Sequence, residues 1–233
     1  MKFRIAAWLF ALALAVAFCL LGRWQLNKAV IKQGMLDRVA AVLRDKQAQS
    51  LAVLSRTDDT RYAWVAGTGH FADAPALLLD NQRRGDAVGV MVFQVFQPDQ
   101  GRALLVELGW LPLPGNRTLP AVTRPDGTLK LSGLLTSPPS AGFALGPAYV
   151  VRDPQRWLLT RVDLGALATG LKTDLSPQVL RLDPALPLGY PRDLDVLPNT
   201  LPPERHRAYA VQWFGLAIAT LVTALVMSLR RKK

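Results

Sequence analysis

Two long apolar runs, one near each end, constrain this chain more than any other feature of its sequence. Residues 5–21 contain no charged side chain, and residues 208–229 contain only four clearly polar ones, at positions 212, 220, 223 and 228. A helix needs about 20 apolar residues to cross the hydrocarbon core of a bilayer, with about 17 as the short limit. Both runs meet this requirement, so we expect two membrane-spanning helices.

The first run has two interpretations, because a secretory signal peptide is also apolar and N-terminal. A cleaved signal ends in a small-x-small site, whereas this run ends in bulky residues just before Gly22 and Arg23. A lipoprotein signal would place a small residue before Cys19, and Phe18 stands there instead. We therefore predict an uncleaved span.

Basic residues at the chain ends predict the orientation of the two spans. The net charge of +11 is high enough for a nucleic-acid-binding protein, but six of the 28 lysines and arginines stand outside the two runs, at the termini. Cationic residues beside a span stay in the cytoplasm. Arg23, Lys28, Arg205 and Arg207 flank the opposite ends and weaken this bias. We expect both termini in the cytoplasm, the lipid bilayer as a partner, and no nucleic acid.

Only four residues precede the first span, which leaves no presequence for import into an organelle, so we expect a multi-pass protein of the bacterial inner (plasma) membrane. This topology divides the chain into five parts. They are a cytoplasmic N-terminus at 1–4, a transmembrane helix at 5–22, an extracytoplasmic (periplasmic) domain at 23–207, a second transmembrane helix at 208–229, and a basic cytoplasmic tail at 230–233.

The two ends of the extracytoplasmic region have different patterns. Residues 23–49 repeat apolar side chains at three- and four-residue intervals, which predicts a helix continuing out of the membrane. Residues 183–203 hold six prolines, which lack the backbone donor that helices and sheets require. We predict an extended strap that returns the chain to the membrane.

The middle of the chain alternates short strand-like segments with polar turns, which predicts a mainly antiparallel sheet or a small barrel. The single cysteine, Cys19, lies in the first run, so this domain folds without a disulfide. The expected fold class is a membrane protein with two transmembrane α-helices flanking a mainly antiparallel β (α+β) domain. The expected strands cover residues 62–65, 76–79, 88–96, 102–110, 129–136, 157–162 and 179–182, with one short helix at 163–171.

Motifs of common enzymes are absent from the sequence. His70 and His206 are the two histidines, and no HExxH, GxSxG or phosphate-binding loop occurs. Residues 67–72 match GxGxxA, but that motif should lead into a helix, and Pro75 follows instead. We interpret Gly67 and Gly69 as a hairpin turn and His70 as a surface residue, and we expect no enzyme.

The most polar cluster outside the runs is residues 80–86, which read as a turn. One interpretation is a solvated loop. The other is a docking surface in which Arg83 and Arg84 contact an acidic partner or the propionates of a cofactor, because the arginine fork donates two bonds to a carboxylate.

The start of the second run, HRAYAVQWF at 206–214, is unusually polar and aromatic for a span. His206, Tyr209 and Trp213 share one helix face. His206 would lie at the outer water boundary, and Trp213 roughly 10 Å deeper. Tyrosine and tryptophan can be plain interfacial anchors there, but the amide of Gln212 requires a partner in lipid.

The first run ends at the same boundary with Trp24 and Gln25. Small residues recur at four-residue spacing in both runs, which lets helices approach closely. An imidazole between aromatic side chains at a lipid boundary suits haem, for which histidine is a common axial ligand. The small residues are Ala13, Ala17, Gly215 and Ala219, and the rim that they would bring together contains His206, Tyr209, Gln212, Trp213, Trp24 and Gln25.

These segments resemble the surfeit locus protein 1 family. LGRWQLNKA at 21–29 resembles the family's LGxWQxxR signature, and HRAYAVQWFGLAIA at 206–219 resembles HxxYAxQWF. Between them, WVAGTGHF at 64–71, LLLDNQRRGDAVGVMVF at 77–93 and LLVELGWLP at 104–112 resemble three internal segments in the expected order.

The resemblance implies a cytochrome c oxidase assembly factor of the respiratory chain that binds or presents haem a for insertion into subunit I, after taking it from haem a synthase. The alternative is a scaffold that docks on the oxidase without haem. The resemblance also implies that His206 is a haem iron ligand, with Tyr209, Gln212, Trp213, Gly22, Trp24 and Gln25 as motif neighbours.

Two departures from the family pattern bear on haem binding. The family's Asn-Arg-Gly is replaced by Glu107-Leu108-Gly109, and the arginine after WQ is displaced by Asn27-Lys28. If that arginine normally meets a propionate, Arg83 or Arg84 would have to replace it.

Overall fold

The computed structural model describes residues 2–52, 62–139, 146–197 and 200–230. The predicted tail at 230–233 therefore lies outside the described residues except for Arg230. The chain forms two compact units: one contains residues 1–38 and 200–233, and the other contains residues 39–199.

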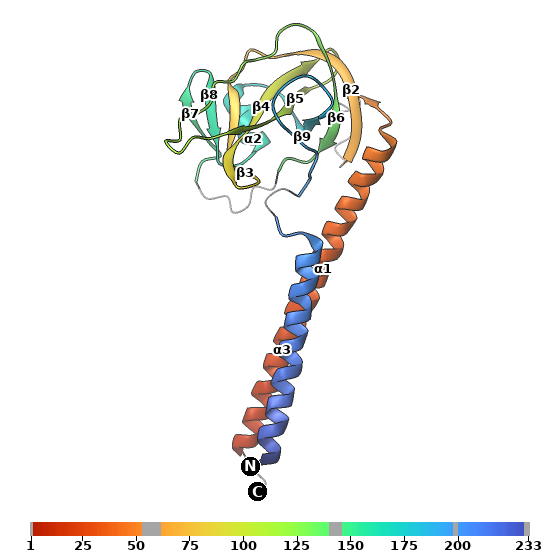
Figure 1. The fold of residues 1–233 in the computed structure, drawn as a ribbon, viewed down its shortest axis with the longest axis vertical. Helices are drawn as coiled ribbons and strands as arrows, with labels where there is room; N and C mark the ends of the chain where they lie inside the picture. Colours follow the sequence, from red (N-terminus) through yellow and green to blue (C-terminus); the bar gives the residue numbers. More distant parts are fainter. Residues whose placement is uncertain (1, 53–61, 140–145, 198–199, 231–233) are drawn as a thin grey trace. The chain divides into compact units, whose positions relative to one another are not determined.

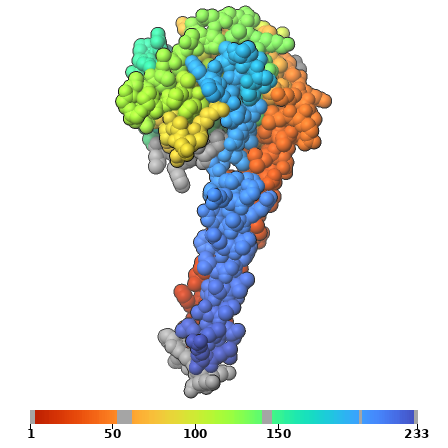
Figure 2. Space-filling view, in the orientation of Figure 1, coloured from red at the N-terminus to blue at the C-terminus, as the bar shows by residue number. Residues whose placement is uncertain are grey.

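The first unit is a pair of antiparallel helices, α1 (Lys2–Asp45) and α3 (Pro203–Arg230), which lie side by side (Figure 1). In the space-filling view α3, in blue, covers much of α1 (Figure 2). Both helices are long and apolar enough to cross a membrane, which suggests a membrane protein.

The helix boundaries differ from the predicted ones. Helix α1 ends at Asp45, so the predicted helical segment 23–49 is four residues too long, because Gln49–Ser50 (β1) pairs in parallel with Val65 and Ala66. Helix α3 begins at Pro203, where a missing N–H costs nothing in the first turn.

The two helices meet on a different face from the one predicted. Ala13, Ala17, Gly215 and Ala219 are exposed, and of the four only Ala219 lines a groove between the helices, so the predicted packing role of Ala13, Ala17 and Gly215 is wrong. Ala13 lies about 200° around the helix from Ala11 at 100° per residue. The buried small residues are Ala11, Ala15, Gly22 and Ala29 on α1 and Ala210 and Ala217 on α3.

These buried positions recur mostly at intervals of four and seven, the spacing of a coiled-coil seam. Gly22 faces the ring of Phe214, and a Cβ at position 22 would lie only 2.8 Å from its Cε1 atom. A Cβ atom added at Gly215 would have no neighbouring heavy atom within 4 Å. The position of the large Phe214 ring therefore decides which small residue lies in the interface.

The second unit contains a mixed nine-stranded sheet in the order β1-β2-β6-β9-β5-β4-β3-β8-β7. A further pairing of β2 with β4 closes β2, β6, β9, β5 and β4 into a ring (Figure 1). The elements are β2 (Tyr62–Phe71), β3 (Ala76–Arg84), β4 (Ala87–Pro98), β5 (Ala103–Pro112), β6 (Leu129–Thr136), β7 (Tyr149–Asp153), β8 (Arg156–Leu159), α2 (Leu164–Leu171) and β9 (Leu175–Leu182).

Antiparallel pairings predominate as predicted, but three pairs are parallel: β1 with β2, β3 with β8, and β5 with β9. The predicted short helix is present as α2, and Asp163 caps it by accepting a hydrogen bond of 3.0 Å from the Ala166 backbone N–H. Leu167 of α2 is fully buried in a cluster with Leu77 and Phe93.

Two predicted turns are strands. Gly67 and Gly69 lie inside β2, where the missing side chains leave room for Leu51 and for the backbone at Gln97 and Pro98. The close approach at Gly69 is where β2 meets β4 and the ring closes. His70 is exposed as predicted.

Residues 80–84 are likewise part of β3 rather than a turn. The chain reverses at Gly85 and Asp86, and Gly85 has a φ of +60°. A side-chain-free residue adopts this conformation at little cost, as two-residue hairpins require.

A buried ion pair links the neighbouring strands β5 and β9, in which Glu107 and Arg181 are register partners. Arg181 donates from Nε to Glu107 Oε1 at 3.0 Å, and both side chains are less than a tenth exposed. Arg181 also donates to the backbone oxygen of Asp193 at 3.3 Å and to that of Asp195. Burial raises the pKa of the Glu107 carboxyl, and the Arg181 guanidinium opposes that rise. The acidic residue that departs from the family pattern therefore has a structural partner.

We predict that Glu107→Leu lowers the free energy of unfolding of the detergent-purified protein by about 3–5 kcal/mol, because it leaves a buried guanidinium without its carboxylate. The double variant Glu107→Leu/Arg181→Leu should recover most of this loss. Asp174→Asn, in the exposed pair with Arg102, is the control and should cost less than about 1 kcal/mol. Denaturant unfolding measures all three, and a double variant no more stable than Glu107→Leu would contradict the prediction.

Candidate functional site

A histidine–glutamine contact links the two helices near the start of α3. His206 is 7% exposed, and its Nδ1 atom lies 2.6 Å from Oε1 of Gln25 on α1. An amide oxygen only accepts hydrogen bonds, so Nδ1 carries the proton and donates. This assignment leaves a lone pair on Nε2.

The Nε2 atom of His206 is buried and has no hydrogen-bond partner in the described part of the chain. Leaving a buried acceptor without a partner costs about 1–3 kcal/mol. A histidine whose one N–H is fixed by an oxygen, and whose other nitrogen keeps its lone pair, has the arrangement of a metal-ligating histidine. Within the described residues His206 belongs to no group of three His, Cys, Asp or Glu side chains, so it offers a single ligand of these types.

The other predicted rim residues are only partly brought together. Trp213 is half-buried and stacks on Phe18 of α1, with ring centroids 5.7 Å apart and an interplanar angle of 28°. Trp24 and Tyr209 are exposed, at 51% and 38%. The Lys28 ammonium lies 5.9 Å from the centroid of the Trp24 ring.

The predicted role of Gln212 in fixing the helix pair is not supported. Gln212 is exposed, and no hydrogen bond from it to α1 occurs among the described residues. At 100° per residue its side chain points about 120° away from that of His206, so it misses the interhelical face.

Basic residues of both helices lie near His206, and the sequence analysis did not connect them with it. Lys28 and Lys32 both act electrostatically on His206, and Lys32 donates to the backbone oxygen of Leu201. Arg207 donates to Gln33 Oε1 at 3.3 Å. The sequence did contain a signal for Lys32, because Gln25, Ala29 and Lys32 are spaced at i, i+4 and i+7 and therefore lie on one helix face.

Arg83 and Arg84 belong to the other compact unit and are exposed on the β3–β4 hairpin. They line a cavity of 220 Å³ together with Trp110 and Arg192. The indole N–H of Trp110 donates to the Gln82 backbone oxygen at 3.0 Å. The pair therefore borders a hollow on the barrel domain whose lining holds four arginines and also the carboxylates of Asp193 and Asp195.

Comparison with known proteins identifies one family. A model of the SURF1 family matches residues 12–218, which include most of α1, the whole barrel and the first part of α3. No curated protein matches the chain.

We predict that the buried His206–Gln25 pair makes the protein less stable than an apolar pair at the same two positions would. Gln25→Leu should lower the thermal midpoint of the detergent-purified protein, because it removes the acceptor of the buried Nδ1–H. The double variant Gln25→Leu/His206→Leu should restore or exceed the original midpoint, because no buried polar group remains.

Gln212→Leu is the control for this comparison, since Gln212 is exposed on the same helix and should change the midpoint little. A double variant less stable than Gln25→Leu would show that the polar pair is needed for helix packing.

Proposed function

Because the chain belongs to the SURF1 family, whose members are cytochrome oxidase assembly factors, we propose that it holds haem a and presents it for insertion into subunit I of the oxidase. The family is one of assembly factors rather than catalysts. Haem a synthase would supply the cofactor, and the protein would bind and release it unchanged.

The free Nε2 lone pair of His206 is the observation that supports haem binding most directly. The amide of Gln25 accepts from Nδ1–H, which fixes the tautomer and makes Nε2 a better donor to iron. A haem brings four ring nitrogens of its own, so one histidine suffices as the protein ligand. The bound haem supplies the iron centre that the finished oxidase uses.

The residues around His206 fit the rest of the cofactor. Trp213, Trp24 and Tyr209 provide aromatic surface for a flat macrocycle, and Lys28 and Lys32 provide cations for its carboxylates. Lys28 occupies the region in which the family pattern has an arginine. Because Nε2 is buried between side chains, haem binding requires the start of α3 to move, while the Gln25 bond can persist.

The proposed location is the bacterial inner membrane, with α1 and α3 as its two spans. Basic residues at both termini favour a cytoplasmic position for them, which places the barrel domain in the periplasm and His206 at the outer boundary of the bilayer. On the barrel domain, Arg83 and Arg84 would contact an acidic segment of an oxidase subunit.

We predict that His206→Ala abolishes most of the haem that co-purifies with the protein when haem a synthesis is co-expressed, because the iron loses its ligand. Gln25→Leu should weaken haem binding about 10- to 100-fold, the usual effect of removing the residue that orients a ligand. Gln212→Ala should bind like the original protein. Absorption spectra at equal protein concentration measure the bound haem, and an unchanged spectrum in His206→Ala would remove the ligand role.

The compact barrel domain supports a second candidate function, a scaffold that docks on oxidase subunits without haem. Replacing the apolar parts of both helices with unrelated spans separates the two functions. We expect the swapped protein to fail to restore oxidase assembly in a deletion strain. Restored assembly at equal membrane abundance would favour the scaffold.

A further inference from the structure

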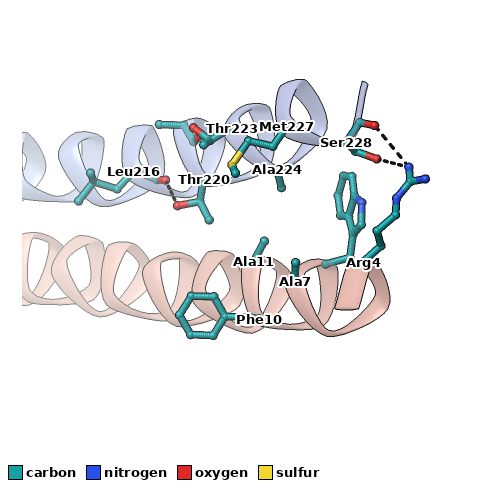
Figure 3. Close-up of a pocket in the computed structure, with 12 residues that line it drawn as sticks. Arg4, Ala7, Phe10, Ala11, Leu216, Thr220, Thr223, Ala224, Met227 and Ser228 are labelled. Carbon is teal, nitrogen blue, oxygen red and sulfur yellow. Dashed lines mark hydrogen bonds between the residues drawn. The ribbon is translucent and has the colours of Figure 1, made fainter. Parts of the chain in front are cut away.

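A groove of 610 Å³ lies between α1 and α3 near both termini, at the opposite end of the helix pair from His206 (Figure 3). Its volume lies in the range of about 300–1,000 Å³ that is usual for pockets that hold organic ligands. The groove exists because alanines face it from both helices, at positions 7 and 11 on α1 and 219 and 224 on α3. Trp8, Phe10, Leu216 and Met227 also line the groove, which still leaves this volume open.

The walls of the groove present apolar surface. Two threonine hydroxyls line it, but each already donates to its own helix: Thr220 to the Leu216 carbonyl and Thr223 to the Ala219 carbonyl, both at 2.8 Å. Figure 3 shows the first of these bonds running along α3. The walls therefore suit an apolar occupant.

The end of the groove carries a cation. Arg4 donates from one guanidinium nitrogen to Ser228, at 2.9 Å to Oγ and 3.4 Å to the backbone oxygen (Figure 3). A guanidinium has five N–H donors, so this contact leaves donors for an anion. The side chain is exposed, and Arg230 follows two residues after Ser228. The groove thus combines an apolar slot with a positively charged end.

The length of the groove distinguishes a lipid chain from a third helix. Its lining runs from Arg4 to Ala11 on α1 and from Leu216 to Ser228 on α3, or roughly 10 Å and 18 Å at 1.5 Å per residue. One leaflet of a hydrocarbon core of about 30 Å is about 15 Å deep. The groove matches one leaflet, whereas a spanning partner helix would need contacts along the whole bilayer.

We propose that this groove binds one acyl chain of an anionic glycerophospholipid, with the lipid phosphate against Arg4. The lipid fills the space that the alanines leave and ties the two helix ends together at the membrane surface. The proposal rests on the membrane position proposed above for α1 and α3, and it does not depend on haem binding.

Native mass spectrometry of the full chain, purified in mild detergent and supplied with phosphatidylglycerol or phosphatidylcholine, tests the proposal. Phosphatidylglycerol should be retained at least fivefold more than phosphatidylcholine. Ala7→Leu, which places a larger side chain in the groove, should lower retained phosphatidylglycerol at least fivefold. Ala13→Leu is the matched control, because Ala13 is another exposed alanine of α1 and lies outside the groove, and it should retain the lipid as the original protein does.

Arg4→Gln should remove the preference for phosphatidylglycerol over phosphatidylcholine. His206→Ala should retain phosphatidylglycerol normally, so a failure of haem binding and a failure of lipid binding give different results. Equal retention of both lipids by the original protein, or equal loss in Ala7→Leu and Ala13→Leu, would overturn the proposal. Cross-linking of a protein segment to residue 7 in membranes would also overturn it, in favour of a partner helix.

Discussion

The packing of α1 against α3 is the constraint on which the other features of the helix pair depend. Small residues on both helices let the backbones approach, and the fit of the Phe214 ring over Gly22 fixes the rotation and register. In that register Gln25 lies opposite His206, and Arg4 lies opposite Ser228. A rotation of either helix by one residue would separate both polar contacts.

The two ends of the helix pair differ in how completely side chains fill the space between α1 and α3. Toward the start of α3, aromatic rings from both helices fill the space, and a polar pair is enclosed with one nitrogen that has no partner among the described residues. Near the termini, alanines face each other and leave an open groove. Helices that packed closely along their whole length would need no ligand. The unpaired nitrogen and the open groove both depart from close packing, and a ligand at either place can compensate for the lost contacts. Functional sites commonly sacrifice stability in this way.

The barrel domain also contains a buried polar arrangement that adds little stability by itself. Its ring closes where Gly69 allows β2 to meet β4, and the pair of Glu107 and Arg181 bridges the neighbouring strands β5 and β9. A buried ion pair adds little net stability over apolar residues of similar size, but it makes the loss of either partner costly. The pair therefore helps to specify which strands lie together and stabilises the segment at Asp193 and Asp195 through backbone bonds.

Local patterns determined the two apolar helices, the strand at 129–136 and the short helix after Asp163, because hydrophobic runs, turn residues and caps are properties of neighbouring residues. They also singled out His206 and Gln25 as candidate site residues. The same patterns gave the wrong helix face through Ala13 and Gly215, since spacing alone does not say which of several small residues meets a large ring on the other helix. They also gave Gly67 and Gly69 as a turn, because a glycine in a strand that makes room for a distant segment has the same local pattern. The turn predicted at 80–86 is confined to Gly85 and Asp86. Ring closure, the Glu107–Arg181 pair and the groove beside Arg4 were decided only by tertiary structure, because each depends on the volumes and charges of side chains that are far apart in the sequence.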